Sequence, residues 1–188
     1  MTETIKAKRD IRKLKLDELK TFFVENGDKP FRAQQVYEWL WQKSCKDFDQ
    51  MTNISLPTRE FLKENFVINH IHVDNMQRSE DGTIKNAVKL HDGLIVESVL
   101  IPTEKRITAC VSSQEGCSLD CKFCATARLK RMRNLNADEI YDQVAAIKEQ
   151  SELFFGRPLT NIVFMGMGEP LLNYNNVVAA IEKITSPK

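Results

Sequence analysis

The chain has 188 residues, of which 42% are hydrophobic and 28% are charged, as in an ordinary globular protein. This composition excludes collagen-like, low-complexity and wholly disordered chains, and the length allows one domain or two small ones. The 27 Lys and Arg residues nearly balance the 26 Asp and Glu residues, so the overall charge indicates no particular partner.

The start of the chain is polar, and no stretch approaches the roughly 18 apolar residues of a membrane helix. We therefore expect a soluble, cytoplasmic protein without membrane contact. The cysteines are more informative, because four of the five lie between residues 110 and 124. An odd, clustered set without a secretion signal indicates metal ligation or catalysis rather than a disulfide framework.

Residues 1–67 are predicted to form a helical accessory domain. Apolar residues recur at helical spacing after Leu16 and again after Ala33, and Ser55 followed by Pro57 marks the start of a third helix. The basic residues near the start of the chain are explained either by a solvated surface or by a contact with RNA.

Residues 68–104 are predicted to form a β-meander of short strands. Alternating apolar residues and two Asp-Gly turns indicate this arrangement. The expected strands are Val67–Val73, Ile84–Leu90 and Leu94–Ile101, and the turns are Asp81-Gly82 and Asp92-Gly93.

Residues 105–188 show the pattern of parallel βα units. A strand at Ile107–Ser112 leads into the cysteines, and a helix begins at the capping box of Asn136 and Glu139 and ends near Gly156. A buried strand at Asn161–Met165 and a final helix follow.

The strongest motif is C-x3-C-x2-C, formed by Cys117, Cys121 and Cys124 just beyond the end of a strand. Three thiolates on one loop can hold three irons of a cubane [4Fe-4S] cluster and leave the fourth iron open. An open iron can bind the amino and carboxylate groups of S-adenosylmethionine and deliver an electron to its sulfonium. A zinc site completed by a histidine or Cys110, or a chance grouping of thiols, are the alternatives, although the spacing is unusual for zinc.

A second motif is the turn Gly166-Met167-Gly168-Glu169-Pro170, at the end of the next predicted parallel strand. Glycines let the backbone approach a ligand, and a carboxylate can bind an ammonium group such as that of methionine. A plain βα connection is the alternative. Ligands of α/β proteins bind at the carboxyl ends of parallel strands, where both motifs are expected, and this favours a shared site.

A local excess of positive charge follows the cysteines. Residues 121–133 contain five basic residues and no acidic one, which is typical either of phosphate attraction or of a solvated loop. The five residues are Lys122, Arg128, Lys130, Arg131 and Arg133.

Taken together, these motifs resemble those of the radical S-adenosylmethionine RNA methyltransferases of the RlmN/Cfr family. The resemblance rests on CVSSQEGCSLDCKFCAT at 110–126, Arg133-Asn134-Leu135 and GMGEPLLN at 166–173, and it extends from about residue 10 to the end of the chain. It implies an α/β fold in which the helical domain and the meander precede the first βα units of a partial, truncated (β/α)6 radical SAM barrel, within residues 105–188.

The resemblance also implies an activity. The family methylates C2 of an adenosine in 23S ribosomal RNA at the peptidyl-transferase centre, and its RlmN branch also methylates the adenosine 3′ of the anticodon in certain tRNAs; the Cfr branch methylates C8. The reaction passes through a methylated cysteine and requires S-adenosylmethionine and an electron donor such as flavodoxin or ferredoxin. C8 methylation, a noncatalytic RNA-binding module and a zinc module stay open as alternatives.

The resemblance assigns roles to individual residues. Cys117, Cys121 and Cys124 would ligate the cluster, and Gly168, Glu169 and Pro170 would contact S-adenosylmethionine, with Phe123 against its adenine. Cys110 would be the resolving thiol of a transient disulfide, and Glu97 the proton acceptor. By pattern alone, Cys110 is a buried strand thiol and Glu97 a solvent-facing strand residue.

The resemblance makes the length of the chain informative. Only about two βα units follow the cluster-bearing strand, and residues 125–188 contain no cysteine that could carry the methyl group. We therefore expect the chain to be a fragment that does not turn over by itself.

Overall fold

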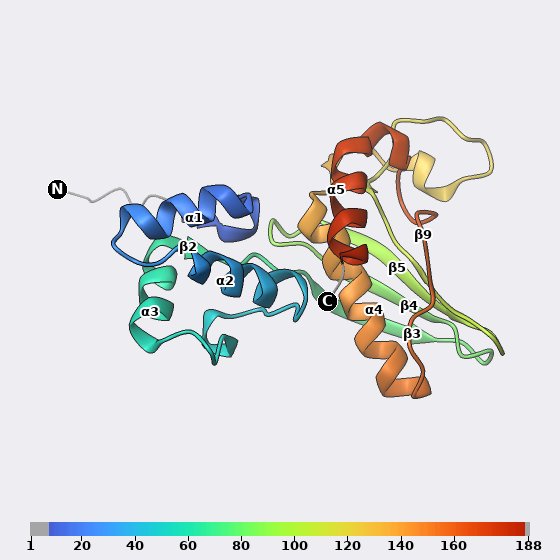
Figure 1. Ribbon diagram of the computed structural model, residues 1–188. Coiled ribbons are helices and arrows are strands. Elements are labelled where there is room, and N and C mark those ends of the chain that lie inside the picture. Colours follow the sequence, from blue (N-terminus) through green and yellow to red (C-terminus); the bar gives the residue numbers. More distant parts are fainter. Residues whose placement is uncertain (1–7, 187–188) are drawn as a thin grey trace. The chain divides into compact units, whose positions relative to one another are not determined.

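The computed structural model describes residues 8–186. The chain divides near residue 70 into two compact units (Figure 1). The first unit ends at Asn69 and the second begins at His70. The outermost residues of the predicted domains, 1–7 and 187–188, lie outside the described residues. Among the helices of residues 8–186, none combines the length and apolarity that crossing a bilayer requires.

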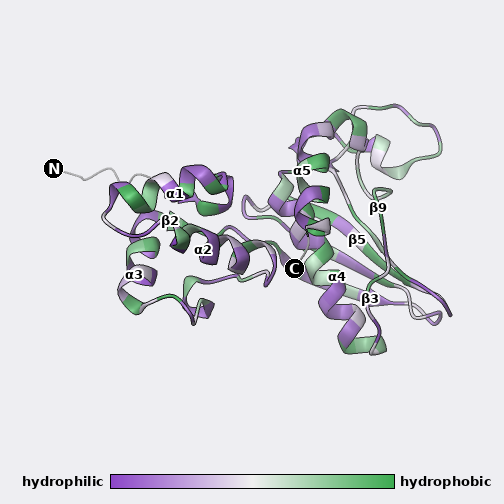
Figure 2. Cartoon of the chain, viewed as in Figure 1, coloured by the Kyte–Doolittle hydropathy of each residue, from purple (hydrophilic) through white to green (hydrophobic). Residues whose placement is uncertain are grey.

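The first unit is helical, as the sequence predicts. Its helices are α1 (Leu16–Glu25), α2 (Phe31–Trp41) and α3 (Leu56–Asn65), and Ser55 caps α3 by accepting a hydrogen bond from the Thr58 N–H. Their buried faces share a core that includes Leu19, Phe23, Val36, Leu40 and Leu62. Each of these helices carries both hydrophobic and hydrophilic residues, as an amphipathic helix does (Figure 2).

A short parallel strand pair links the two ends of this unit. β1 (Arg9–Asp10) pairs with β2 (Phe66–Val67), and the Asp10 carboxylate accepts a hydrogen bond from the Asn69 N–H at 3.2 Å. The predicted strand Val67–Val73 is therefore wrong. Phe66 and Val67 pair within the helical unit, and β3 (His72–Arg78) begins separately and carries mostly exposed side chains.

The second unit is built on a five-stranded sheet with the order β3-β4-β5-β6-β9. The first four strands form an antiparallel meander, and β6 pairs with β9 in parallel. The remaining strands of this sheet are β4 (Ile84–Lys89), β5 (Ile95–Pro102), β6 (Ile107–Cys110) and β9 (Asn161–Val163). Positive φ angles at Gly82 and Gly93 confirm the two predicted Asp-Gly turns.

Helices α4 (Ala137–Phe155) and α5 (Tyr174–Thr185) pack together on one face of this sheet (Figure 1). The expected capping box of Asn136 and Glu139 begins α4, and Gly156 ends it in the left-handed conformation, with φ 60°. Alternate strand residues such as Val88, Val96 and Ala109 bury against these helices. The intervening residues face the opposite side of the sheet, on which neither α4 nor α5 packs.

One element was not expected from the sequence. β7 (Gln114–Glu115) and β8 (Arg133–Asn134) form a small antiparallel pair, so that the cysteine loop is the connection within a hairpin. The predicted strand Ile107–Ser112 ends at Cys110, and the chain turns into this hairpin instead of running straight into the cysteines.

Candidate metal and cofactor site

The two sequence motifs lie at the same edge of the sheet because β6 and β9 are parallel neighbours. The pairing continues past the end of β6, where the Val111 N–H donates to the Val163 carbonyl at 3.0 Å. Past the end of β9, the Gly166 N–H donates to the Val111 carbonyl at 3.1 Å. The Ser113 N–H then donates to the Met167 carbonyl at 2.9 Å. The turn 166–170 therefore lies directly against the segment that leads into the cysteine loop.

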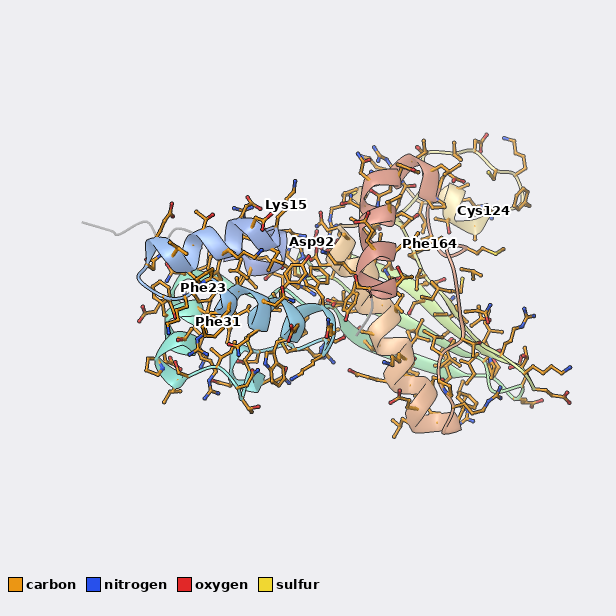
Figure 3. All side chains as sticks on the ribbon, in the orientation of Figure 1. Lys15, Phe23, Phe31, Asp92, Cys124 and Phe164 are labelled. Carbon is orange, nitrogen blue, oxygen red and sulfur yellow. The ribbon has the colours of Figure 1, made fainter. Side chains whose placement is uncertain are left out.

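Cys117, Cys121 and Cys124 are free thiols, and each is partly exposed. They lie on the loop that extends from the end of the sheet, on which Cys124 is labelled in Figure 3. Backbone N–H groups of the following short helix, first that of Ala127, lower the pKa of the Cys124 thiol. A lowered pKa favours the thiolate, which is the form that binds metals.

The donor chemistry of this loop fits an iron–sulfur cluster, because three unpaired thiols are what a cluster with one open iron needs. The two sides of the loop pack closely at its base. A Cβ atom added to Gly116 would lie only 2.5 Å from the Lys130 carbonyl oxygen, so this position has no room for a side chain. The thiols are not gathered, however. Residues 8–186 contain no group of three His, Cys, Asp or Glu side chains placed to hold a metal ion.

The turn 166–170 is shaped by its glycines. A Cβ on Gly166 would lie 2.7 Å from the Ser112 Oγ and from the Val111 carbonyl, and one on Gly168 would lie 2.6 Å from the Gln114 Cγ. Gly168 also has φ +92°, which disfavours any side chain. The backbone of the turn thus approaches residues 111–114 as closely as a glycine allows. Glu169 begins the short 3-10 helix Pro170–Asn173 by accepting a hydrogen bond from the Leu171 N–H at 3.0 Å.

Glu97 and Cys110 lie on the same face of the sheet, opposite to α4 and α5. Cys110 is the register partner of Val99, which is two residues from Glu97 and therefore on the same side of β5. The Glu97 carboxylate is half exposed and pairs with the Lys85 ammonium at 2.6 Å. Burial raises the pKa of the Cys110 thiol, which is only 9% exposed.

Phe123 lies within the cysteine loop and is 94% exposed. Exposing an aromatic ring to water is unfavourable in free energy, so the exposed Phe123 ring favours a partner that stacks on it. Its expected position against an adenine stays a prediction.

The basic residues after the cysteines differ in what they can offer an RNA. Arg133 turns inward, where its guanidinium binds Glu139 and Asp92, each at 2.7 Å. Lys122 pairs with Asp120 at 2.5 Å in an exposed position, and Arg131 donates to Asn134 at 3.2 Å. Arg133 is therefore a structural residue, and the exposed positive charge of this loop is smaller than the sequence indicates.

Three buried polar residues near the turn were not singled out from the sequence: Ser112, Gln114 and Asn173. Ser112 Oγ donates to the Glu97 carbonyl at 2.5 Å and accepts from the Met167 N–H at 2.8 Å. Asn173 donates to the carbonyls of Ser113 and Leu135 at 2.8 Å. The polar run Ser112-Ser113-Gln114 directly after a buried strand was the signal that could have revealed two of them.

Two family models match the chain. Residues 9–68 match the ribosomal RNA large subunit methyltransferase N-terminal domain, and residues 111–187 match the radical SAM superfamily. The second match includes the cysteine loop and the turn 166–170, and its family is one that generally uses S-adenosylmethionine and a [4Fe-4S] cluster.

Curated relatives from bacteria match almost the whole chain. The probable dual-specificity RNA methyltransferase RlmN of Christiangramia forsetii is 73% identical over 181 residues, which are 96% of this chain and 51% of the relative. The dual-specificity RNA methyltransferase RlmN of Geotalea uraniireducens is 44% identical over 180 residues, again 96% of this chain and 51% of the relative. The chain thus spans about half the length of the curated relatives it matches.

A solved structure shows the same fold. The crystal structure of a radical SAM methyltransferase from Sphaerobacter thermophilus superposes with a TM-score of 0.82 and 34% identity, covering 96% of this chain and 52% of that one. The expected mixed α/β fold, with part of a radical SAM methyltransferase architecture, is confirmed.

Proposed function

Because the chain belongs to the RlmN family of radical SAM RNA methyltransferases, we propose that it functions in the methylation of adenosine at C2, in 23S ribosomal RNA and in certain tRNAs. The observation that carries the proposal is the position of the turn 166–170 directly against the segment that leads into the cysteine loop, at the carboxyl ends of parallel strands. The carboxyl ends of parallel strands are where α/β proteins bind their ligands. Here they carry a loop with three thiols of the kind that ligate clusters, and a glycine turn whose backbone a ligand can approach closely.

In this proposal Cys117, Cys121 and Cys124 hold the [4Fe-4S] cluster. When bound, the cluster supplies the electron that cleaves the sulfonium of S-adenosylmethionine, after reduction by a donor such as flavodoxin or ferredoxin. Gly168, Glu169 and Pro170 bind and orient the methionine part of S-adenosylmethionine, and Phe123 stacks on its adenine.

Glu97 and Cys110 serve the later steps of the proposed reaction. Glu97 removes the proton from the adenine ring, which a half-exposed carboxylate on the open face of the sheet can reach. Cys110 acts as the resolving thiol toward a methyl-carrying cysteine. Its burial raises the pKa of the thiol and so favours the protonated form, which is less easily oxidised than the thiolate.

The RNA is proposed to contact the helical unit and the exposed basic residues of the cysteine loop. The family model for the first unit is named for ribosomal RNA methyltransferases, and Arg128 and Lys130 remain exposed next to the proposed site. Phosphate contacts of this kind position an RNA without reading its sequence. The target adenosine would have to leave its stack, because C2 is inaccessible within a helix.

The test is the position of the methyl group in RNA. A chimera that joins this chain to the part of the Christiangramia forsetii relative outside the match is expressed in cells lacking their own adenine methyltransferase. Mass spectrometry should find 2-methyladenosine, and the Cys121→Ala chimera should leave the RNA unmodified. A methyl group at C8, or no difference between the two chimeras, would overturn the proposal. The 188-residue chain by itself is expected to give no methylation.

A further inference from the structure

The side-chain amide of Gln114 connects the two halves of the proposed cofactor site. Its Oε1 accepts a hydrogen bond from the Glu169 N–H at 2.9 Å, and its Nε2 donates to the Asn134 Oδ1 at 2.7 Å. Glu169 belongs to the turn 166–170, and Asn134 belongs to β8, the strand that follows the cysteine loop. One side chain therefore spans from the hairpin of that loop to the turn.

The backbone bonds described above hold the turn only as far as Met167, whose carbonyl accepts from the N–H groups of Ser113 and Gln114. Beyond this point, among residues 8–186, the peptide of Glu169 is held to the hairpin by the Gln114 side chain. Asn134 extends the same connection, because its Nδ2 donates to the Leu172 carbonyl at 3.2 Å. The segment around the Glu169 carboxylate is thus fixed on both sides by the pair Gln114 and Asn134.

Gln114 is fully buried, so the presence of a polar side chain at this position needs a physical reason. A buried amide costs free energy unless both its donor and its acceptor are satisfied, and here both are. An apolar residue of the same size would fill the space but could neither accept from Glu169 nor donate to Asn134. The absence of a side chain at Gly168 is what lets the turn approach Gln114 so closely.

We propose that Gln114 is a positioning residue of the S-adenosylmethionine site, whose amide locks the turn 166–170 against the β7–β8 hairpin so that the turn is preformed for the cofactor. The inference rests on the proposed function. It assigns no chemistry to Gln114 itself. Preorganisation of this kind raises affinity because the turn need not be ordered when the ligand binds.

The experiment measures S-adenosylmethionine binding by calorimetry on the chimera that tests the proposed function, after anaerobic reconstitution with iron and sulfide. Gln114→Met should bind S-adenosylmethionine about tenfold more weakly, as is typical when a partner of a binding residue is lost, while its iron and sulfide content stays unchanged. Asn134→Leu should weaken binding less, because Gln114 can still accept from Glu169. The double variant should be no weaker than Gln114→Met, since the two residues act as one unit.

The control is Asn86→Leu. Asn86 is also fully buried and pairs with the Gln150 amide at 2.8 and 2.9 Å, but it lies on β4 and contacts neither the turn nor the hairpin. This variant should lose stability and keep its affinity for S-adenosylmethionine, which separates positioning from general destabilisation. If Gln114→Met binds as tightly as the unsubstituted chimera, the inference fails and the proposed function stands. If the unsubstituted chimera assembles a cluster but does not bind S-adenosylmethionine, both fail.

Discussion

The guanidinium of Arg133 holds both carboxylate oxygens of Glu139, with two N–O distances of 2.7 Å. Glu139 is 1% exposed, and the same carboxylate accepts from the Asn136 N–H at 2.8 Å to begin α4. The hydrogen bond from Arg133 also lowers the pKa of Asp92. A single arginine thus ties the end of the cysteine loop to the first turn of α4 and to the turn after β4.

Arg133→Ala should lower the free energy of unfolding by about 3 kcal/mol, because it removes the guanidinium that holds both oxygens of a buried carboxylate. Urea unfolding followed by circular dichroism measures this loss. The matched control is Arg128→Ala on the same loop, an exposed position whose replacement should change stability by less than about 0.5 kcal/mol. Equal effects of the two substitutions would show that Arg133 is an ordinary surface charge.

Glu97→Gln should abolish RNA methylation by the chimera and leave the fold almost unchanged. Its ion pair with Lys85 is half exposed, and such pairs contribute at most about 1 kcal/mol. Lys85→Met removes the same ion pair and should retain methylation, so it serves as the control. Full methylation by Glu97→Gln would exclude Glu97 as the proton acceptor.

Cys110 should react with iodoacetamide much more slowly at pH 8 than Cys117, in protein freed of metal. Burial raises the pKa of Cys110, and only the thiolate reacts. Its rate should therefore continue to rise as the pH increases past the ordinary thiol pKa of about 8.5. Mass spectrometry of digested protein follows each cysteine separately. Equal rates at pH 8 would contradict the burial of this thiol.

Gly168→Ala should cost at least about 2 kcal/mol of stability, because it combines a positive φ with a clash against Gln114. Gly156→Ala provides the comparison, since Gly156 also has positive φ but has open space around its Cβ position. This control should cost only about 1 kcal/mol. Thermal unfolding of the two variants compares them, and equal losses would mean that the turn is not packed tightly against Gln114.

The parts of the fold that could be predicted are those specified by neighbouring residues. The capping box of Asn136 and Glu139 and the left-handed Gly156 define α4 by local rules, and the Asp-Gly turns define the meander in the same way. The edge strand β3 escaped prediction because most of its residues are polar and exposed, so its sequence lacks the alternation of a half-buried strand.

The motifs of the candidate site can be read from the sequence, and the contacts that support them cannot. The cysteine spacing and the turn at Gly168 are visible as motifs, because their residues lie close together in the sequence. The β7–β8 pair joins residues that are far apart in sequence and has only two residues in each strand, too few to show a period. The inward turn of Arg133 and the bridge made by Gln114 likewise depend on partners that only the folded chain brings near.

The most direct test of the central claim is the metal content of the protein purified without oxygen. We expect about four iron atoms and four acid-labile sulfides per chain, with loss of both in Cys121→Ala. Stoichiometric zinc without acid-labile sulfide, or unchanged iron and sulfide in Cys121→Ala, would contradict it.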